Sequence, residues 1–493
     1  MKVKPVILVI LDGFGYAPDG PGNAIALAKK PMFDYLFTHY PSVLLQASGN
    51  AVGLPEGVDG NSEVGHTTIG AGRIIPSPFL QIINDIQSGE FFSKPVLVEH
   101  LEQLSANGKT LHILGLLSDA GNHCHPHIIF AVIKAAQNHN IKKIVVHAIL
   151  DGRDVPPQSA AQYLEILEQY TKRYENVVLG SIIGRFYAMD RNNNWDRTQA
   201  TYITLTNKQT IQFPDWRTAL NYYYAHNITD EFIPPLLLDA DNIINNGDGV
   251  IFANFREDRA RQLATCFITP EHVPFALKPM KLSFFISTVS YGTEFNNPVL
   301  YIKKPASNTL KELLSKAGKR IFTIAETEKY AHITYFFADG KEQPLEGETR
   351  ILIPSRAEKK YDQYPQMSAQ QITDAVIHSL QTDPYDFYLI NYANADMAGH
   401  SGNLEATIKA VECLDNQIEQ LYKQIIKKMD GTIFITADHG NAEMKLTSTG
   451  QPHTGHTTNP VPFIFIKNEL YDTKMKLPLS GLSDIASFIL RWI

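Results

Sequence analysis

The last fifth of the sequence concentrates carboxylate and imidazole side chains in three short motifs. Asp396 and His400 are four residues apart, and Asp438 and His439 are adjacent. His456 ends the segment Gln-Pro-His-Thr-Gly-His. Carboxylate oxygen and imidazole nitrogen together suit divalent ions such as Mn²⁺, Zn²⁺ or Fe²⁺. Any one of these residues alone is better explained as a helix cap or a packed side chain. The group as a whole favours a metal site.

Asp12 supplies a further carboxylate near the N-terminus, directly after an apolar run at 6–11. With Asp12 included, the set holds more ligands than one ion needs. Sites with two metal ions commonly serve phosphate chemistry. The residue types therefore predict two divalent ions and a phosphorylated substrate.

Ser62 lies in the segment Gly-Asn-Ser-Glu-Val-Gly-His, where small residues flank a serine and an apolar pattern begins again. A serine in this position could cap the N-terminus of a helix, or it could be a nucleophile activated by a metal ion. A phosphoryl group on Ser62 would lie at a helix N-terminus, which favours anions. The residues alone leave both interpretations open.

Short apolar runs precede the carboxylate motifs and predict the elements that position them. The runs 6–11, 387–391 and 432–436 are apolar almost throughout, which is typical of strands buried on both faces. Apolar residues at 408–425 repeat every three or four positions, which predicts a helix that ends at Asp430-Gly431. Strand, helix and strand in this order predict a βαβ unit with parallel pairing and a right-handed crossover.

Similar runs at 109–117, 144–150 and 177–183 extend the pattern, so the sequence predicts an α/β fold with parallel sheets. Parallel sheets bind ligands beyond the carboxyl ends of their strands. Asp12 and Asp438 are at the two ends of the chain, yet both follow such strands. If they meet, both chain ends form one domain and the middle is an insertion.

Composition limits the class of protein. The 493 residues are 44% hydrophobic and 19% charged, which predicts two or three packed domains and excludes a disordered chain. The net charge of −7 argues against nucleic acid or an anionic membrane as the partner. The apolar run at 6–11 is too short for a signal peptide or a membrane span. Three cysteines far apart (Cys124, Cys266 and Cys413) indicate a reducing compartment, so we expect a cytoplasmic protein.

The chain resembles the cofactor-independent phosphoglycerate mutases of the alkaline phosphatase superfamily, through long motifs in the same order over almost its entire length. The motifs include Leu-Asp12-Gly-Phe-Gly, Gly-Asn-Ser62-Glu-Val-Gly-His, Leu-Asp-Gly-Arg153-Asp154-Val-Pro-Pro, Gly-Arg185-Phe-Tyr-Ala-Met-Asp-Arg191, Asn-Phe-Arg256-Glu-Asp-Arg259, Ala-Glu-Thr-Glu-Lys329-Tyr-Ala-His, Ala-Asp396-Met-Ala-Gly-His400 and Ala-Asp438-His439-Gly-Asn-Ala-Glu-Met.

The resemblance implies interconversion of 3-phosphoglycerate and 2-phosphoglycerate through a phosphoserine on Ser62, without 2,3-bisphosphoglycerate. It implies two Mn²⁺ ions, for which other divalent metals could substitute. One ion would be held by Asp396, His400 and His456, and the other by Asp12, Ser62, Asp438 and His439. His453 belongs to the same motif as His456, but the family pattern gives the ligand role to His456.

The resemblance also implies a set of substrate-binding residues. They are His123, Arg153, Asp154, Arg185, Arg191, Arg256, Arg259 and Lys329. A phosphoglycerate carries a phosphate and a carboxylate, and planar guanidinium groups bind both kinds of anion. Asp154 is in addition a candidate general acid and base, because it accompanies Arg153.

The family pattern implies two domains. Residues 1–76 and 304–493 would form a metal-binding, phosphatase-like domain, and residues 77–303 an inserted α/β substrate-binding domain. We expect the insertion to close over the site, because losing glycerate to water would make the enzyme a phosphatase. We also expect a monomer with small-molecule substrates and with neither nucleic-acid nor membrane partners.

Two other interpretations remain. A metal-dependent phosphatase or phosphopentomutase of the same superfamily would share the two-metal core, and a non-catalytic binding protein would retain the fold alone. The arginine-bearing middle of the chain favours the phosphoglycerate enzyme over the first. The intact ligand set and Ser62 speak against the second.

Overall fold

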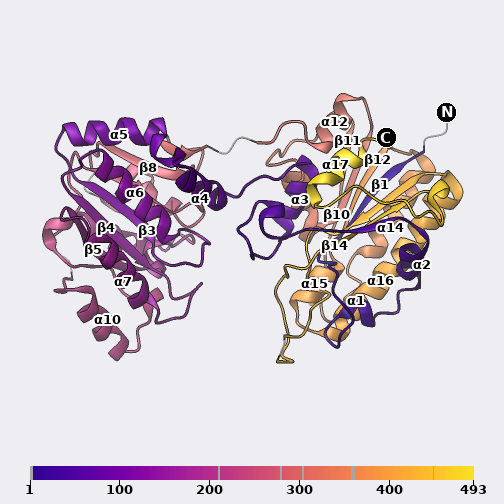
Figure 1. Ribbon diagram of the computed structural model, residues 1–493, viewed down its shortest axis with the longest axis horizontal. Coiled ribbons are helices and arrows are strands. Elements are labelled where there is room, and N and C mark those ends of the chain that lie inside the picture. Colours follow the sequence, from indigo (N-terminus) through magenta and orange to yellow (C-terminus); the bar gives the residue numbers. More distant parts are fainter. Residues whose placement is uncertain (1–3, 209–210, 278–279, 303–304, 357–360, 448) are drawn as a thin grey trace. The chain divides into compact units, whose positions relative to one another are not determined.

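The chain forms two compact units in a computed structural model that describes residues 4–208, 211–277, 280–302, 305–356, 361–447 and 449–493. Unit 1 comprises Met1–Ser77 and Pro305–Ile493, and unit 2 comprises Pro78–Lys304. Each unit contains a seven-stranded sheet (Figure 1). The predicted boundary between residues 303 and 304 falls outside the described residues.

Unit 1 is built from both ends of the chain. Its strands are β1 (Val6–Leu11), β2 (Ser42–Leu45), β10 (Ile321–Glu326), β11 (Glu348–Ile353), β12 (Phe387–Tyr392), β13 (Thr432–Thr436) and β14 (Val461–Ile466). Its helices are α1 (Ala24–Leu27), α2 (Pro31–His39), α3 (Ser62–Ala71), α12 (Leu310–Lys316), α13 (Thr327–Ala331), α14 (Ala369–Thr382), α15 (Asn394–His400), α16 (Leu404–Tyr422) and α17 (Ile485–Ile489).

The sheet of unit 1 has the strand order β11-β10-β12-β1-β13-β14-β2. Strand β1 is buried at all six residues and pairs in parallel with β12 on one side and β13 on the other. The three predicted strands are therefore confirmed, and β12 extends one residue beyond its predicted end. The predicted parallel βαβ unit is confirmed, since β12 and β13 run parallel in one sheet, but they do not pair with each other because the equally apolar β1 lies between them.

The predicted α/β fold with parallel sheets is confirmed, and antiparallel strand pairs occur only towards the sheet edges among the described residues. Strand β14 is antiparallel to β13 and to β2 in unit 1. In unit 2, the two-residue strand β6 (Leu236–Leu237) is antiparallel to β5 (Val177–Gly184). The remaining pairs are parallel, so the fold class is α/β with parallel-rich sheets.

Helix α16 is the predicted helix of the βαβ unit. Asn403 caps its N-terminus by accepting a hydrogen bond from Ala406 N. The helix continues as a π-helix, Lys423–Lys428, and the chain then turns at Asp430, whose φ is +54°. Figure 1 shows α14 and α16 along one face of the sheet, where Val411, Leu414 and Ile418 enter the core.

Unit 2 repeats the α/β pattern with the strand order β6-β5-β4-β3-β7-β8-β9. Its other strands are β3 (Leu111–Leu116), β4 (Ile144–Leu150), β7 (Gly249–Phe252), β8 (Phe284–Val289) and β9 (Val299–Tyr301). Its helices are α4 (Pro78–Ser88), α5 (Pro95–Ala106), α6 (Pro126–Asn138), α7 (Ala160–Thr171), α8 (Arg185–Ala188), α9 (Trp195–Thr206), α10 (Trp216–Ala225) and α11 (Arg261–Ile268). No helix among the described residues combines the length and the apolar character needed to cross a membrane.

A chain of buried polar side chains crosses the strands of unit 2 and makes its stability depend on pH. His112 Nδ1 lies 2.9 Å from His147 Nε2, and His147 Nδ1 lies 2.8 Å from Ser181 Oγ. The other ring nitrogen of His112 lies 3.4 Å from Asp248 Oδ2. Burial lowers the pKa of both imidazoles, and Asp248 offsets part of this effect at His112. Both histidines are therefore neutral in the folded protein at pH 7.

Acidification should destabilise unit 2, because the unfolded chain binds protons at these histidines below about pH 6.5 while the folded chain does not. For His147, whose pKa lies well below its usual value, the loss should be about 1.4 kcal/mol of unfolding free energy per pH unit, and His112 should add to it in the same direction. Urea unfolding at pH 7.5 and pH 5.0 measures the effect. His147→Gln should show a smaller loss than the wild type between the two pH values. Equal losses in the two proteins would contradict the prediction.

Candidate functional site

The predicted metal ligands of unit 1 gather where three neighbouring strands end. Asp12 follows β1, Asp396 lies on α15 just after β12, and Asp438 follows β13. Asp12 N donates a hydrogen bond to Tyr392 O at the end of β12, over 3.0 Å. All three carboxylates are buried. Parallel pairing thus brings together residues that are more than 400 positions apart in the chain.

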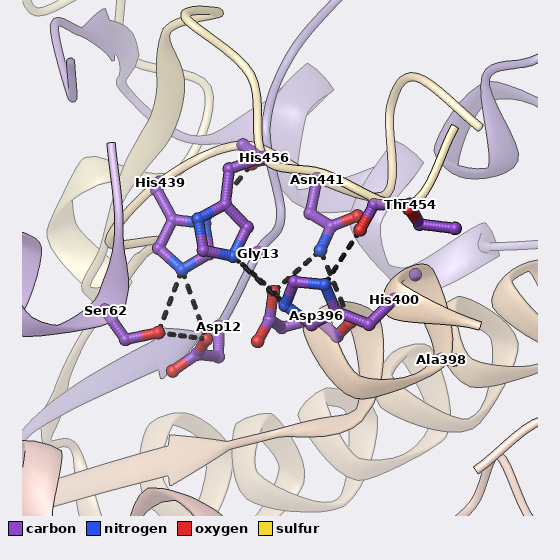
Figure 2. A network of polar contacts seen from close by, with 12 residues as sticks. Asp12, Gly13, Ser62, Asp396, Ala398, His400, His439, Asn441, Thr454 and His456 are labelled. Atoms are coloured by element: carbon purple, nitrogen blue, oxygen red, sulfur yellow. Dashed lines mark hydrogen bonds and ion pairs between the residues drawn. The ribbon is translucent and has the colours of Figure 1, made fainter. Parts of the chain in front are cut away.

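Ser62 is the first residue of α3, and the structure tests the two roles considered for it, helix cap and nucleophile. The helix cap is Asn61, whose side chain accepts a hydrogen bond from Val64 N at 3.1 Å. The interpretation of Ser62 as the cap is therefore wrong. Its Oγ instead donates to Asp12 Oδ1 over 3.2 Å and lies 3.0 Å from His439 Nε2 (Figure 2).

A first cluster of ligand atoms is formed by Asp396, His400 and His456 (Figure 2). The two Nε2 atoms lie 3.1 Å apart, and they are 3.2 Å (His400) and 3.4 Å (His456) from Asp396 Oδ1. Each Nδ1 donates to a backbone carbonyl, that of Thr454 for His400 and that of Gly60 for His456. Such hydrogen bonds leave both Nε2 atoms free to bind a metal ion. His453 is not part of this cluster; its Nδ1 faces Met444 O at 3.1 Å.

A second cluster is centred on His439, whose Nδ1 faces its neighbour Gly440 O at 3.2 Å. Its Nε2 lies 3.5 Å from Asp12 Oδ1 and 3.5 Å from Asp438 Oδ2, in addition to the contact with Ser62. The four side chains predicted to hold the second ion, Asp12, Ser62, Asp438 and His439, are therefore neighbours.

Lys329 lies between the two clusters. Its Nζ donates to Asp12 Oδ1 at 2.6 Å, to Ser62 Oγ at 2.8 Å and to Asp396 Oδ2 at 2.7 Å. The pKa of Lys329 is raised, because the surrounding carboxylates outweigh the opposing effect of burial. In turn, the ammonium group holds the pKa values of Asp12 and Asp396 below their usual range, although burial acts in the opposite direction.

Two buried residues that the sequence did not single out hold the second cluster. Asn391 Nδ2 donates to Asp12 Oδ2 at 2.9 Å and to His66 Nε2 at 3.0 Å. His66 Nδ1 donates to Ser62 O at 2.8 Å and lies 3.1 Å from Asp438 Oδ2. Because both ring nitrogens of His66 are engaged, this histidine supports the cluster. The sequence offered two signals for these residues: His66 belongs to the same motif as Ser62, and Asn391 lies near the end of a predicted strand.

The first cluster has comparable support. Asn441 Nδ2 donates to Asp396 Oδ1 at 2.7 Å. Glu443 accepts hydrogen bonds from Asn441 N at 2.8 Å, from Asn459 Nδ2 at 3.0 Å and from the hydroxyl group of Thr457. These contacts tie the loop that carries His456 to the loop that follows β13.

The residues present fit divalent metal ions. Ligand atoms of Asp396, His439 and His456 lie within 4.8 Å of one another. Asp12 and Asp438 converge in the same way around His66, whose own ring nitrogens are engaged in hydrogen bonds. Asp438 Oδ2 is buried and accepts no hydrogen bond among the described residues, and its neighbours are the imidazoles of His66 at 3.1 Å and His439 at 3.5 Å. A buried carboxylate oxygen without a donor is costly unless a cation binds it. The oxygen and nitrogen donors match the preferences of Mn²⁺, Zn²⁺ or Fe²⁺.

The predicted substrate-binding residues of unit 2 also gather at neighbouring strand ends, those of β5, β4, β3 and β7. Arg185 is buried, and its Nη1 donates to Asp151 Oδ1 at 2.6 Å and to Asp154 Oδ2 at 2.7 Å. His123 Nε2 lies 3.8 Å from Asp154 Oδ2. Burial, with the nearby Arg185 and Arg256, lowers the pKa of His123 to about 4, so this ring is neutral at pH 7.

The other cations surround this group. Arg191 and Arg256 both contact Asp258, Arg256 at 3.2 Å, while Arg259 Nη1 donates to Met189 O at 3.2 Å. Burial lowers the pKa of Arg259, and repulsion from Arg191, Arg185 and Arg153 adds to the effect. Guanidinium groups that repel one another are a site for anions. Lys329, predicted to bind substrate with these residues, belongs to unit 1.

Two buried nitrogen atoms of this group have no hydrogen-bond partner within the part of the chain that the structure describes. They are His123 Nδ1 and Arg185 Nε. Buried polar atoms are normally paired, so atoms left unpaired at the end of a sheet indicate a bound polar ligand.

Gly65 allows α3 to approach the loop that carries Asp438. A Cβ atom at position 65 would lie 2.4 Å from Asp438 O and 2.8 Å from Asp438 Cβ. Gly65→Ala should therefore displace a predicted ligand, lower activity at least tenfold, and cost about 1–3 kcal/mol of unfolding free energy. Steady-state kinetics and urea unfolding check this. Gly20→Ala is the control, because its Cβ would have only Pro18 O, 4.0 Å away, as a neighbour; equal effects at both positions would contradict the argument.

Comparisons with a family model, with protein sequences and with solved structures all indicate the same kind of protein. The family model for the metalloenzyme superfamily matches residues 4–493. A protein of Acaryochloris marina named 2,3-bisphosphoglycerate-independent phosphoglycerate mutase is 45% identical, with 99% of this chain and 92% of that protein covered. A protein of Legionella pneumophila with the same name is 43% identical, with coverage of 99% and 94%. The solved phosphoglycerate mutase of Leishmania mexicana, determined at low cobalt concentration, superposes with a TM-score of 0.67 at 29% identity, covering 99% of this chain and 95% of that one.

Proposed function

Because this chain belongs to the family of 2,3-bisphosphoglycerate-independent phosphoglycerate mutases, within the metalloenzyme superfamily, we propose that it interconverts 3-phosphoglycerate and 2-phosphoglycerate through a phosphoserine on Ser62. The observation that carries the proposal is the position of Ser62 Oγ. It is buried at a helix N-terminus, 3.0 Å from His439 Nε2 and 2.8 Å from Lys329 Nζ. Ser62 is the one side chain among the described residues whose hydroxyl group contacts Asp12, His439 and Lys329 together.

We propose two Mn²⁺ ions as the resident metals, with the ligand sets that the family pattern implies. Asp396, His400 and His456 would hold one ion, and Asp12, Ser62, Asp438 and His439 the other. Bound divalent ions would supply positive charge that favours the ionised Ser62 oxygen and offsets the charge of the transferring phosphoryl group. The close approach of these side chains to one another, and an Asp438 Oδ2 that accepts no hydrogen bond among the described residues, support metal binding here. His439 is near the carboxylates of both clusters, so its place in the second set follows the family pattern.

In the first half of the reaction, the ionised Ser62 oxygen attacks the phosphorus atom of 3-phosphoglycerate. A bond forms from Ser62 to phosphorus, and the bond from phosphorus to the 3-oxygen of glycerate breaks. Lys329 donates a hydrogen bond to Ser62 and stabilises the negative charge there.

Asp154 is the proposed general acid and base. Although burial acts in the opposite direction, Arg185 holds the pKa of Asp154 below its usual range, so the carboxylate is ionised at rest. It takes up the proton that Ser62 releases and passes it to the departing 3-oxygen, and the reverse transfer returns a proton to Ser62 in the second half.

In the second half, Asp154 accepts the proton of the 2-hydroxyl group, and this oxygen takes the phosphoryl group back from Ser62. Glycerate must stay bound between the two halves. His123, Arg153, Arg185, Arg191, Arg256 and Arg259 are proposed to hold its carboxylate and the phosphate. We assign unit 2 (Pro78–Lys304) as this substrate-binding domain and unit 1 as the metal-binding domain. The family pattern places the same division one residue earlier, at 77–303 for the insertion and 1–76 with 304–493 for the metal-binding domain.

The deciding experiment uses metal-stripped protein and 3-phosphoglycerate, with and without added Mn²⁺, in the absence of 2,3-bisphosphoglycerate. We expect Mn²⁺-dependent formation of 2-phosphoglycerate with little free phosphate. Free phosphate as the only product would indicate a phosphatase of the same superfamily, and the absence of any reaction would favour a binding protein. The cytoplasmic location and the monomeric state remain predictions.

A further inference from the structure

Asp151 is a buried carboxylate that the proposed reaction does not use. It directly follows β4 in the segment Leu-Asp-Gly-Arg-Asp, and only 2% of its surface is exposed. A buried carboxylate is retained at a site where other groups satisfy its charge and its hydrogen-bonding capacity. The identity of those groups shows what Asp151 does.

All three donors to Asp151 Oδ1 belong to predicted substrate-binding residues. They are Arg153 N at 3.2 Å, Asp154 N at 3.0 Å and Arg185 Nη1 at 2.6 Å. Its second oxygen, Oδ2, accepts a hydrogen bond from Ser118 Oγ at 2.6 Å. Ser118 follows β3 and Arg185 follows β5, so this one carboxylate joins the ends of three neighbouring strands.

The contacts fix both the direction of Arg185 and the course of the chain at 153–154. Arg185 Nη1 is shared by Asp151 and Asp154, which holds the guanidinium group against the proposed general acid. A long arginine side chain has many rotamers, so a fixed position requires such partners. Gly152 has a φ of +63°, and this turn brings the N–H groups of Arg153 and Asp154 back to Asp151.

We infer that Asp151 is a positioning residue for phosphoglycerate binding, which sets the geometry of Arg153, Asp154 and Arg185 without touching the substrate itself. The inference rests on the proposed function, because it takes the substrate-binding role of those three residues from it. Loss of the carboxylate would free Arg185 on one side and release the turn that presents Arg153.

Asp248 provides a matched control for general loss of stability. It is also buried in unit 2, and it accepts hydrogen bonds from Thr110 N at 3.1 Å and Asn245 N at 2.9 Å. Asp248 lies directly before β7, whereas Asp151 directly follows β4. These strands run in the same direction, so the two carboxylates are at opposite ends of the strands of this sheet. Among the described residues, none of the hydrogen-bond partners of Asp248 is a predicted substrate-binding residue.

The experiment compares wild type, Asp151→Asn and Asp248→Asn as Mn²⁺-loaded enzymes. Two quantities are measured: kcat and KM for 3-phosphoglycerate, and the rise in Tm that this substrate causes. Asp151→Asn should raise KM at least tenfold, lower kcat by a smaller factor and reduce the substrate-induced rise in Tm. Asp248→Asn should lower the Tm of the free enzyme while KM stays within twofold of wild type.

A KM within twofold of wild type for Asp151→Asn would overturn the inference, and so would equal increases of KM in both variants. If Asp151→Asn does not fold, Ser118→Ala decides, because it removes only the donor to Oδ2. That variant should raise KM about threefold or more, and an unchanged KM would overturn the inference. A wild-type enzyme without mutase activity would instead overturn the proposed function, and the inference with it.

Discussion

Ser62→Ala should lower the rate of 2-phosphoglycerate formation by at least about a thousandfold, because it removes the proposed nucleophile. The side chain is small, and its loss leaves the hydrogen bonds between Lys329 and the carboxylates of Asp12 and Asp396 in place. The variant should therefore fold, and its Mn²⁺ affinity should fall far less than its activity. A loss confined to kcat would assign the effect to the chemical step.

Covalent transfer can be tested on the same variant. Wild-type enzyme quenched with acid during turnover should carry one phosphoryl group, which intact-protein mass spectrometry detects and fragmentation places on Ser62. Ser62→Ala should carry none. Ser315→Ala is the control, because its Oγ donates to Glu346 O, which lies outside both ligand clusters. Mutase turnover that persists in Ser62→Ala would rule out the phosphoserine route.

Lys329→Met should have the second-largest effect, lowering activity at least about a hundredfold and destabilising the metal-free protein by about 3–5 kcal/mol. The ammonium group is the cation that contacts both Asp12 and Asp396, at 2.6 and 2.7 Å. Its removal leaves two buried carboxylates facing one another without that partner. Urea unfolding of the metal-free protein measures the loss.

Mn²⁺ should restore more stability to Lys329→Met than to the wild type, because bound cations would take over the role of the missing ammonium group. Lys311→Met is the matched control. Lys311 is equally buried in unit 1 and pairs with Glu348 at 2.7 Å, away from the two ligand clusters. This control should destabilise the metal-free protein, but its response to Mn²⁺ should equal that of the wild type. The same response in both variants would contradict the assigned role of Lys329.

Much of the local structure could be predicted from the sequence. The strands β1, β4 and β13 have the predicted bounds, because a short run that is mostly apolar fits a strand buried on both faces. The helix after Asn403 follows from its apolar period. The motifs that carry the ligand and substrate residues are contiguous in the chain, so the family could be named without knowing where the segments lie in space.

Other features were decided by the tertiary structure alone. The place of β1 between β12 and β13, the antiparallel edge strands and the contact of Lys329 with Asp12 and Asp396 depend on pairings across tens to hundreds of residues. Local composition carries no information about such pairings, because several apolar runs are equally suitable neighbours. The supporting roles of Asn391, His66 and Asp151 were hidden for the same reason, since buried hydrogen bonds become visible only when distant chain segments meet.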